Sequence, residues 1–466
     1  MRQESDFLGS KDLPDTAYWG VHAARAVENF PITGHSVAQM PHLIRAFAYV
    51  KKAAAAANLS LGTINAQQAQ AIAQACDDVA TGMLDAHFVV DVLQGGAGTS
   101  TNMNANEVIA NRALEIIGQP KGAYDVIHPN DHVNASQSTN DTYPTAVKLA
   151  TYFGIQDLLA ALAALRGAFQ VKAEEFKNIL KIGRTQLQDA VPMTLGQEFA
   201  AFASMIAADE KRLRESASLL CEINMGGTAI GTGINAPVGY ADVVTAKLAE
   251  FSGVPVVKAE DMIAATADTG VFADISGILK RIAVKLSKIS NDLRLLSSGP
   301  QAGVGDIKLP ARQAGSSIMP GKVNPVIPEV VSIACFEAIG NDAAITMAVE
   351  AGQLQLNAFE PLMAWALHKS LHHLASACQT LQVNCVEGIV ANTALLGERI
   401  AESVTLVTAL NPLIGYEKAA SIAKAAIASG KPIAQVAEEL GIMSQADMQQ
   451  LLVADKLTQA GALKAA

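Results

Sequence analysis

The chain has 466 residues, of which half are hydrophobic and only 17% are charged, and its formal net charge is −10. These values exclude a nucleic-acid partner, because phosphate binding needs a clustered basic face and no run of Lys or Arg occurs. A chain of this length needs two or three domains or one long architecture, and so few charges suggest that much surface is buried between subunits.

The first segment, residues 1–140, is expected to form an N-terminal domain. Short helical patches at 44–59, 65–84 and 104–118 alternate there with loops rich in Gly and Pro. The N-terminus carries no apolar signal segment, and no apolar run looks long enough and free enough of charge to span a bilayer. We therefore expect a cytoplasmic protein with no membrane partner.

The central segment, residues 141–395, is expected to form a bundle of long helices. Its strongest periodic stretch, 274–298, repeats Ile and Leu at steps of three and four. Comparable stretches follow Pro144, Pro192, Pro325 and Pro361. Helices of roughly 25–35 residues would be about 40–50 Å long, and such rods bury their apolar stripes best against one another. The predicted fold class is therefore mainly all-α.

The last segment, residues 396–466, is expected to form a small helical C-terminal domain, because Pro and Gly separate short amphipathic patterns there. The five cysteines of the chain are odd in number and lie mostly in apolar helical patterns, which favours buried thiols over disulfides. His372 and His373 are adjacent, and neither CxxC nor HExxH occurs, so no dedicated metal site is predicted.

Four stretches rich in Gly, Ser, Thr and Asn each stand directly before a predicted helix. They are residues 95–104 (GGAGTSTNMN), 136–141 (SQSTND), 183–189 (GRTQLQD) and 315–324 (GSSIMPGKVN). Each one alone is typical of a helix-capping sequence. Together they would supply backbone N–H groups and neutral hydroxyl donors at positive helix ends, which suits the binding of a dicarboxylate.

The fourth stretch, extended to Pro325, resembles the signature loop of the aspartase/fumarase superfamily. The resemblance continues along nearly the whole chain, through residues 20–22, 28–30, 102–107, 128–131, 138–141 and 410–412. It implies a three-domain fold whose long central helices join those of other subunits in a common core. It also implies a lyase that requires no metal or cofactor, and it leaves open an activating divalent cation such as Mg²⁺ at a separate site.

The same resemblance assigns roles to residues of the four stretches. Ser316 would be the general base, its alkoxide stabilised by backbone N–H groups of the 315–318 turn and by the cation of Lys322. Apart from the resemblance, Arg184 is expected either to contact the substrate or to brace the third stretch by pairing with a carboxylate, and bracing is favoured. The substrate would be bound by Thr99, Ser138 and Thr139 at its β-carboxylate, by Thr185, Lys322 and Asn324 at its α-carboxylate, by Asn140 at its amino group, and additionally by Gln186 and Ser317.

Two features favour ammonia over water as the leaving group. Residues 95–100 read GGAGTS, as in aspartases, where fumarases tend to have TGSGTQ, and position 186 is Gln where fumarases place a His. The predicted reaction is the reversible deamination of L-aspartate to fumarate and ammonia through an aci-carboxylate intermediate. Residues 414–420 are closer to the fumarase pattern, which keeps hydration of fumarate as an alternative. A non-catalytic, crystallin-like relative is a second alternative.

Geometry adds an expectation about assembly. Antiparallel neighbours in a bundle place successive helix starts at opposite ends, so one subunit would have difficulty gathering all four loops around one substrate. Geometry therefore favours sites shared between subunits. The resemblance implies a homotetramer in which each active site takes its loops from three different subunits.

Overall fold

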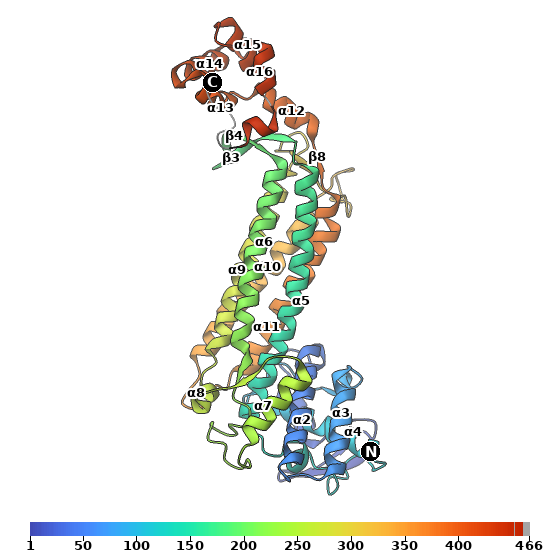
Figure 1. Cartoon of the computed structure of the whole chain (residues 1–466). Coiled ribbons are helices and arrows are strands. Elements are labelled where there is room, and N and C mark those ends of the chain that lie inside the picture. The colour runs from blue at the N-terminus through green and yellow to red at the C-terminus, as the bar shows by residue number, and fades with distance from the viewer. Residues whose placement is uncertain (452, 460–466) are drawn as a thin grey trace. The chain divides into compact units, whose positions relative to one another are not determined.

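The computed structural model describes residues 1–451 and 453–459 (Figure 1). Helices dominate, as predicted, and among these residues the strands form only two-stranded sheets. The chain divides into two compact units. Unit 1 contains Met1–Leu159, Lys211–Ala283 and Phe336–Ala375, and unit 2 contains Ala160–Glu210, Val284–Cys335 and the chain from Ser376 onward. The division into domains at residues 140 and 395 stays a prediction.

Unit 1 holds the N-terminal elements and several elements from the middle of the chain. They are the hairpin β1 (Arg2–Asp6) and β2 (Gly9–Leu13), the helices α1 (Val21–Asn29), α2 (Pro41–Ser60), α3 (Ala66–Ala80), α4 (Thr99–Ile116), α7 (Tyr240–Ser252) and α8 (Met262–Ala267), and the parallel pair β5 (Glu222–Ile223) and β6 (Val257–Lys258). Helix α2 packs against α3 and α7, and α3 packs against α4 (Figure 1). An Asn65/Gln68 capping box fixes the start of α3.

Five long helices contribute residues to both units: α5 (Thr139–Glu175), α6 (Leu195–Ala217), α9 (Gly270–Leu296), α10 (Val326–Glu350) and α11 (Glu360–Asn384). Polar contacts join neighbours within unit 1, where Ser276 Oγ on α9 donates to Asp342 Oδ1 on α10 over 2.8 Å. Within unit 2, Arg166 Nε on α5 donates to Glu210 Oε1 on α6 over 2.7 Å. The predicted bundle of long helices is therefore present.

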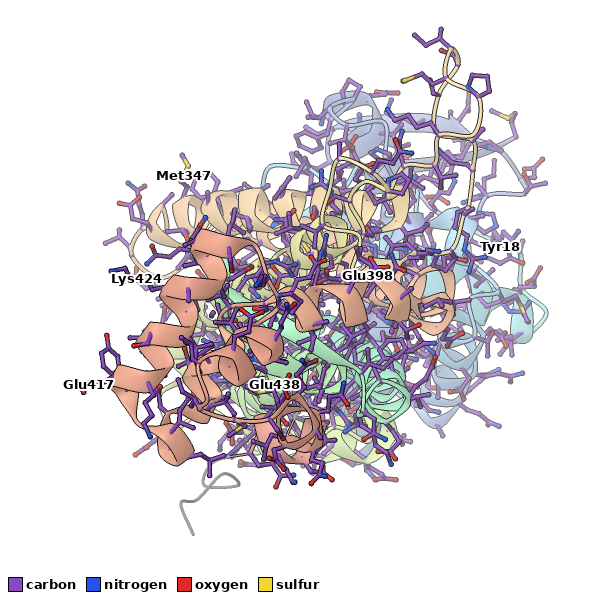
Figure 2. The ribbon with its side chains drawn as sticks, turned by 90° about the horizontal axis from the view of Figure 1, so that it is seen from above. Tyr18, Met347, Glu398, Glu417, Lys424 and Glu438 are labelled. Carbon is purple, nitrogen blue, oxygen red and sulfur yellow. The ribbon has the colours of Figure 1, made fainter. Side chains whose placement is uncertain are left out.

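Two of these helices correct an expectation about membranes. Helices α5 and α10 are long and apolar enough to cross a bilayer, although no such run was expected from the sequence. Protein buries 67% of the most apolar window of α5, which is typical of a core helix. The corresponding share is 39% for α10, and Val330, Ile333 and Met347 on this helix are exposed. Met347 projects away from its helix (Figure 2).

Unit 2 joins a hairpin to the C-terminal helices. The hairpin is β3 (Leu180–Thr185) and β4 (Gln188–Thr194), a second strand pair is β7 (Ile307–Lys308) and β8 (Val390–Ala391), and the helices are α12 (Thr393–Glu402), α13 (Leu406–Ile414), α14 (Tyr416–Ser429), α15 (Ile433–Glu439), α16 (Gln445–Leu451) and α17 (Ala454–Leu457). Leu410, Ile422 and Ile433 are fully or almost fully buried in one cluster with Ile182 of β3. Glu417 and Lys424 mark α14, and Glu438 marks α15 (Figure 2). The five cysteines are all free and buried, as predicted.

Candidate active site

The first polar stretch forms a tight turn before α4. Gly96, Ala97 and Gly98 have successive φ values of +93°, +53° and +86°, and Gly98 is the N-cap residue of the helix. A Cβ atom at Gly98 would lie 2.2 Å from the ring of Tyr143, so glycine is required there by space as well as by conformation. The half-buried Thr99 that follows donates its hydroxyl to Gly96 O over 2.7 Å.

The second polar stretch caps α5, which begins at Thr139 rather than at the predicted Pro144. Ser138 N donates to Asp141 Oδ1 over 3.0 Å, and Asn140 N donates to Ser138 Oγ over 3.2 Å. Capping by these side chains moves the helix start ahead of the proline. Since Ser138 Oγ accepts a backbone hydrogen bond, its own hydroxyl proton remains available to a bound anion.

Thr139 and Asn140 stand at the first turn of the same helix. Thr139 Oγ1 accepts a hydrogen bond from Asn102 Nδ2 over 3.1 Å, so its hydroxyl proton is also available. Asn140 Nδ2 donates to Ala229 O over 2.8 Å, and no described residue donates to Asn140 Oδ1. Because that oxygen can only accept, it suits an ammonium group.

Asp141, which the sequence reasoning quoted without a role, anchors this region. It is fully buried and accepts hydrogen bonds from Gly226 N over 3.1 Å and Thr228 N over 2.9 Å in addition to Ser138 N. Burial raises the pKa of this carboxyl, and the backbone donors act against that rise. Asp141 thereby fixes the second polar stretch to the Gly-rich loop at 226–233, which no sequence pattern had singled out.

The third polar stretch is the turn of the β3–β4 hairpin. The expectation that this stretch stands directly before a helix is wrong, because it turns between two strands and Pro192 pairs with Ile182 in the hairpin. The helix expected after Pro192 is α6, which begins at Leu195. Thr185 and Gln186 are exposed at the turn. Gln186 and Leu187 have φ values of +52° and +62°, a conformation that costs non-glycine residues energy.

Arg184 braces this hairpin, as predicted. Its Nη1 donates to Asp306 Oδ2 over 2.7 Å, and Asp306 is fully buried. Lys181 Nζ lies 3.1 Å from Asp306 Oδ2, and Arg399 Nη1 lies 2.6 Å from Oδ1. Burial opposes ionisation of Asp306, but Arg184 and Lys181 outweigh it and hold the pKa below its usual value. Asp306 therefore ties the hairpin to α12.

The fourth polar stretch folds into a loop that is fastened at its base. Gly315 N donates to Lys322 O over 2.7 Å, and Asn324 Nδ2 donates to Gly315 O over 2.6 Å. A Cβ atom at Gly315 would lie 2.7 Å from both Asn324 N and Lys322 O, so only glycine fits. We refer to these two hydrogen bonds as the loop clasp. The loop then leads through Pro325 into α10.

Within this loop Ser316 is half-buried and backbone N–H groups hold its hydroxyl oxygen, while its role as a base stays a prediction. Its Oγ accepts hydrogen bonds from Ile318 N over 3.2 Å and from Met319 N over 3.0 Å. Two N–H donors stabilise negative charge on an oxygen and therefore favour the alkoxide.

Two further predicted site residues of this loop, Ser317 and Lys322, are exposed. No described carboxylate lies within ion-pair distance of Lys322, so its charge is available to an anion. Lys322 and Asn324 line a groove of about 780 Å³ together with residues of the 297–310 segment and Glu329. Asn324 uses one of its N–H groups in the loop clasp, which leaves the other for a ligand.

The predicted site residues fall into two groups. Thr99, Ser138, Thr139 and Asn140 belong to unit 1, whereas Thr185, Gln186, Ser316, Ser317, Lys322 and Asn324 belong to unit 2. Asn102 joins Thr139 in the first group, and the loop clasp joins Asn324 to the Ser316 loop in the second. No group of three His, Cys, Asp or Glu side chains placed to hold a metal ion occurs among residues 1–451 and 453–459.

Two family models match the chain. One, described as "Lyase", matches residues 9–340, and the other, described as "Fumarase C C-terminus", matches residues 406–459. Aspartate ammonia-lyase of Helicobacter pylori is 51% identical over 464 residues, covering 100% of this chain and 99% of the relative. The protein of the same name from Escherichia coli K12 is 50% identical over 458 residues, covering 98% and 96%.

Solved structures are similar over the same length. The fumarate lyase:delta crystallin from Brucella melitensis, whose structure was determined bound to cobalt, has 54% identity and a TM-score of 0.93, covering 97% of this chain and 98% of that one. The class II fumarase from Schistosoma mansoni has 34% identity and a TM-score of 0.89, also covering 97% and 98%.

Proposed function

Because the chain belongs to the aspartase/fumarase family of lyases, we propose that its polar loops form an active site that removes ammonia from L-aspartate. Relatives named aspartate ammonia-lyase, at 50–53% identity over almost their whole length, support this activity. The chain is a carbon–nitrogen lyase, and its products are fumarate and ammonia.

The observation that carries the mechanism is the hydrogen bonding of Ser316. A serine alkoxide takes a proton from the carbon beside the β-carboxylate of aspartate, and the electron pair moves onto that carboxylate as an aci-carboxylate. The pair then returns to form the double bond of fumarate while the carbon–nitrogen bond breaks and ammonia leaves. A serine hydroxyl is a weak base in water, and the N–H groups of Ile318 and Met319 supply stabilisation of its alkoxide.

The β-carboxylate lies at the hydroxyl groups of the first and second polar stretches. Ser138 and Thr139 each accept a hydrogen bond from the protein and thus direct their protons outward. Thr99 adds a third hydroxyl after it releases Gly96 O. Donors that meet the growing charge of the aci-carboxylate stabilise the transition state more than the bound substrate, which is the requirement for catalysis.

The other end of aspartate is held by the second group of residues. Lys322 supplies the positive charge for the α-carboxylate, and Thr185 and Asn324 supply neutral donors. Gln186 and Ser317 are the remaining substrate contacts. Asn140 accepts a hydrogen bond from the ammonium group through Oδ1. The reaction in this scheme proceeds without a metal or cofactor.

The working form is a homotetramer in which several subunits build each active site. The exposed apolar residues of α10 support burial of this helix against other subunits: Ile333 is 64% exposed and Met347 is 72% exposed. The predicted cytoplasmic location stays part of this proposal.

Incubation with L-aspartate tests the function. The expected result is ultraviolet absorbance of fumarate with release of an equal amount of ammonia. A parallel incubation with L-malate should form little fumarate. Efficient fumarate formation from malate, without any from aspartate, would identify a fumarase instead. Activity on neither substrate, with the chain folded, would favour the crystallin-like alternative.

A further inference from the structure

Lys51 on α2 is fully buried, although lysine is rarely buried without a charged partner. Its ammonium group donates to three amide oxygens: Asn102 Oδ1 over 2.7 Å, Asn134 Oδ1 over 2.9 Å and Gln137 Oε1 over 3.0 Å. No described carboxylate lies within ion-pair distance of it. The hydrogen bonds that offset the burial of this charge therefore all come from neutral acceptors.

This arrangement dictates how each amide is oriented. An ammonium group has three donors and no acceptor, so every amide around Lys51 must turn its oxygen inward and its NH₂ group outward. The outward NH₂ groups all meet acceptors. Gln137 Nε2 donates to Val133 O over 2.9 Å, and Asn134 Nδ2 donates to Gln137 O over 3.3 Å. The opposite orientation of Asn102 would set its NH₂ group against the ammonium group.

Asn102 transmits this orientation to the active site. With its oxygen on Lys51, its NH₂ group points at Thr139 and donates to Thr139 Oγ1 over 3.1 Å. Because the threonine oxygen then accepts from the protein, its hydroxyl proton is the group left for the substrate. The chain of contacts from Lys51 through Asn102 to Thr139 therefore sets the direction in which this hydroxyl donates.

We propose that Lys51 is a positioning residue that, through Asn102, makes Thr139 a hydrogen-bond donor to the developing aci-carboxylate. This inference rests on the proposed function. Lys51 does not touch the substrate, and its effect reaches the reaction through the Thr139 hydroxyl. Burial lowers the pKa of Lys51 to about 7, and the charge of Asp141 acts against this fall.

Two variants test the proposal. Lys51→Met removes the donors and keeps the length of the side chain. Asn102→Asp keeps the size of the side chain but replaces the NH₂ group by an oxygen, so the Thr139 hydroxyl would turn toward the protein. The new carboxylate would pair with Lys51, which should preserve or raise the melting temperature. Lys52→Met is the matched control, because Lys52 is next on the same helix and pairs with Asp77 of α3 over 2.6 Å.

The readouts separate positioning from folding. We expect at least about a tenfold loss of kcat in both variants with less than about a threefold change in KM, because the lost interaction strengthens in the transition state. Calorimetry with 3-nitropropionate, whose nitronate resembles the aci-carboxylate, should show at least about a tenfold loss of affinity. Binding of succinate, a ground-state dicarboxylate, should change less, and Lys52→Met should match the wild type in both.

Three outcomes decide the matter. A folded Asn102→Asp variant with the wild-type ratio of nitronate to succinate affinity would overturn the proposal. The same ratio in a folded Lys51→Met variant would also overturn it, and if that variant does not fold, Asn102→Asp decides alone. Failure of the wild type to form fumarate from aspartate would contradict the proposed function instead, and the ratio of affinities would still decide the role of Lys51.

Discussion

Ser316 combines access to substrate with an oxygen already held by two backbone N–H groups. Ser316→Ala should lower kcat by at least about a hundredfold while the affinity for succinate stays nearly unchanged, because the hydroxyl is needed in the transition state more than in the bound state. Steady-state kinetics with L-aspartate measure the first quantity and calorimetry the second. A loss of less than about tenfold, or about 1.4 kcal/mol, would reject Ser316 as the base.

Lys322 is exposed and has no carboxylate partner among the described residues, which leaves its charge for the proposed contact with the α-carboxylate. Lys322→Ala should therefore raise KM for L-aspartate and lower kcat together, with little change in melting temperature. Initial rates over a range of aspartate concentrations give both constants. An unchanged KM would show that the α-carboxylate is bound elsewhere.

Sequence reasoning at this scale could name the residues of the polar stretches but not their supports. Two exceptions could be expected: backbone N–H donors to Ser316 Oγ, from the signature loop, and the bracing role of Arg184, from a cation inside the third polar stretch. Lys51 was missed because a lysine is normally placed at the surface. Its spacing of four from Phe47 and Ala55, both buried, was the available signal that it lies on the inner face of α2.

The start of α4 depends on a turn of glycines and alanine. Gly96→Ala would meet no atom closer than 3.9 Å, so it should cost only the strain of positive φ, roughly 1–2 kcal/mol. Gly98→Ala must in addition displace the buried ring of Tyr143 and should cost about 1–3 kcal/mol more. Urea unfolding of the two variants measures the difference. Equal unfolding midpoints and slopes for the two variants would show that the Tyr143 ring moves aside without a measurable cost in stability.

Helix α11 carries a histidine, His368, whose environment disfavours protonation in the folded chain. His368 stacks on Trp365 and on His372, with ring centroids 5.6 Å and 6.0 Å apart. Burial, followed by the charges of His372, His42 and His373, lowers the pKa of His368 to about 4.

The unfolded chain therefore binds a proton here near pH 6.5 while the folded chain does not, and stability falls as the pH drops from about 6.5 to about 4. His368→Gln should remove at most about 3 kcal/mol of that loss. Melting temperatures of both proteins between pH 7 and pH 4 check this, and parallel curves would contradict it.

Helix boundaries show where periodicity stops being informative. The apolar repeat located α9, and helices follow Pro325 and Pro192 as expected, but the stretch at 183–189 does not stand directly before α6, which begins at Leu195. The polar string at 183–189 has the composition of a helix cap and also of a turn, and pairing of Ile182 with Pro192 selects the turn. Ile182 also packs with residues of the C-terminal helices. Contacts between residues so far apart in the sequence cannot be predicted from a local pattern.

Among the described residues, the whole molecule leaves apolar side chains of α10 such as Ile333 and Met347 exposed. If such exposed residues are buried between subunits and the active site is shared, two inactive variants should complement each other in mixed tetramers. Thr185→Ala and Ser316→Ala proteins, unfolded together and reassembled, should regain part of the wild-type activity, because some sites would receive both intact loops. Native mass spectrometry confirms that the mixture is hybrid. Hybrids no more active than their parents, or a fully active monomer in sedimentation, would contradict the shared site.

At this scale the mainly helical fold could be predicted, because apolar residues that recur every three or four positions over a long stretch indicate a long helix. The grouping of residues into compact units could not, because the five long helices each contribute to both units and carry no break in composition. The apolar character of α10 was visible in the sequence, but only burial on the folded chain shows how much of it remains exposed.

The loop clasp separates the stability of this loop from the side chains at its tip. The two hydrogen bonds of the loop clasp join the two ends of the loop. The exposed side chains of Ser317, Ile318 and Met319 are therefore not needed to hold the loop together. Substitutions at these tip positions should therefore cost little in folding stability. Since the same positions belong to the string that resembles the family signature, the demand on them comes from the proposed work of the loop on the substrate rather than from the fold.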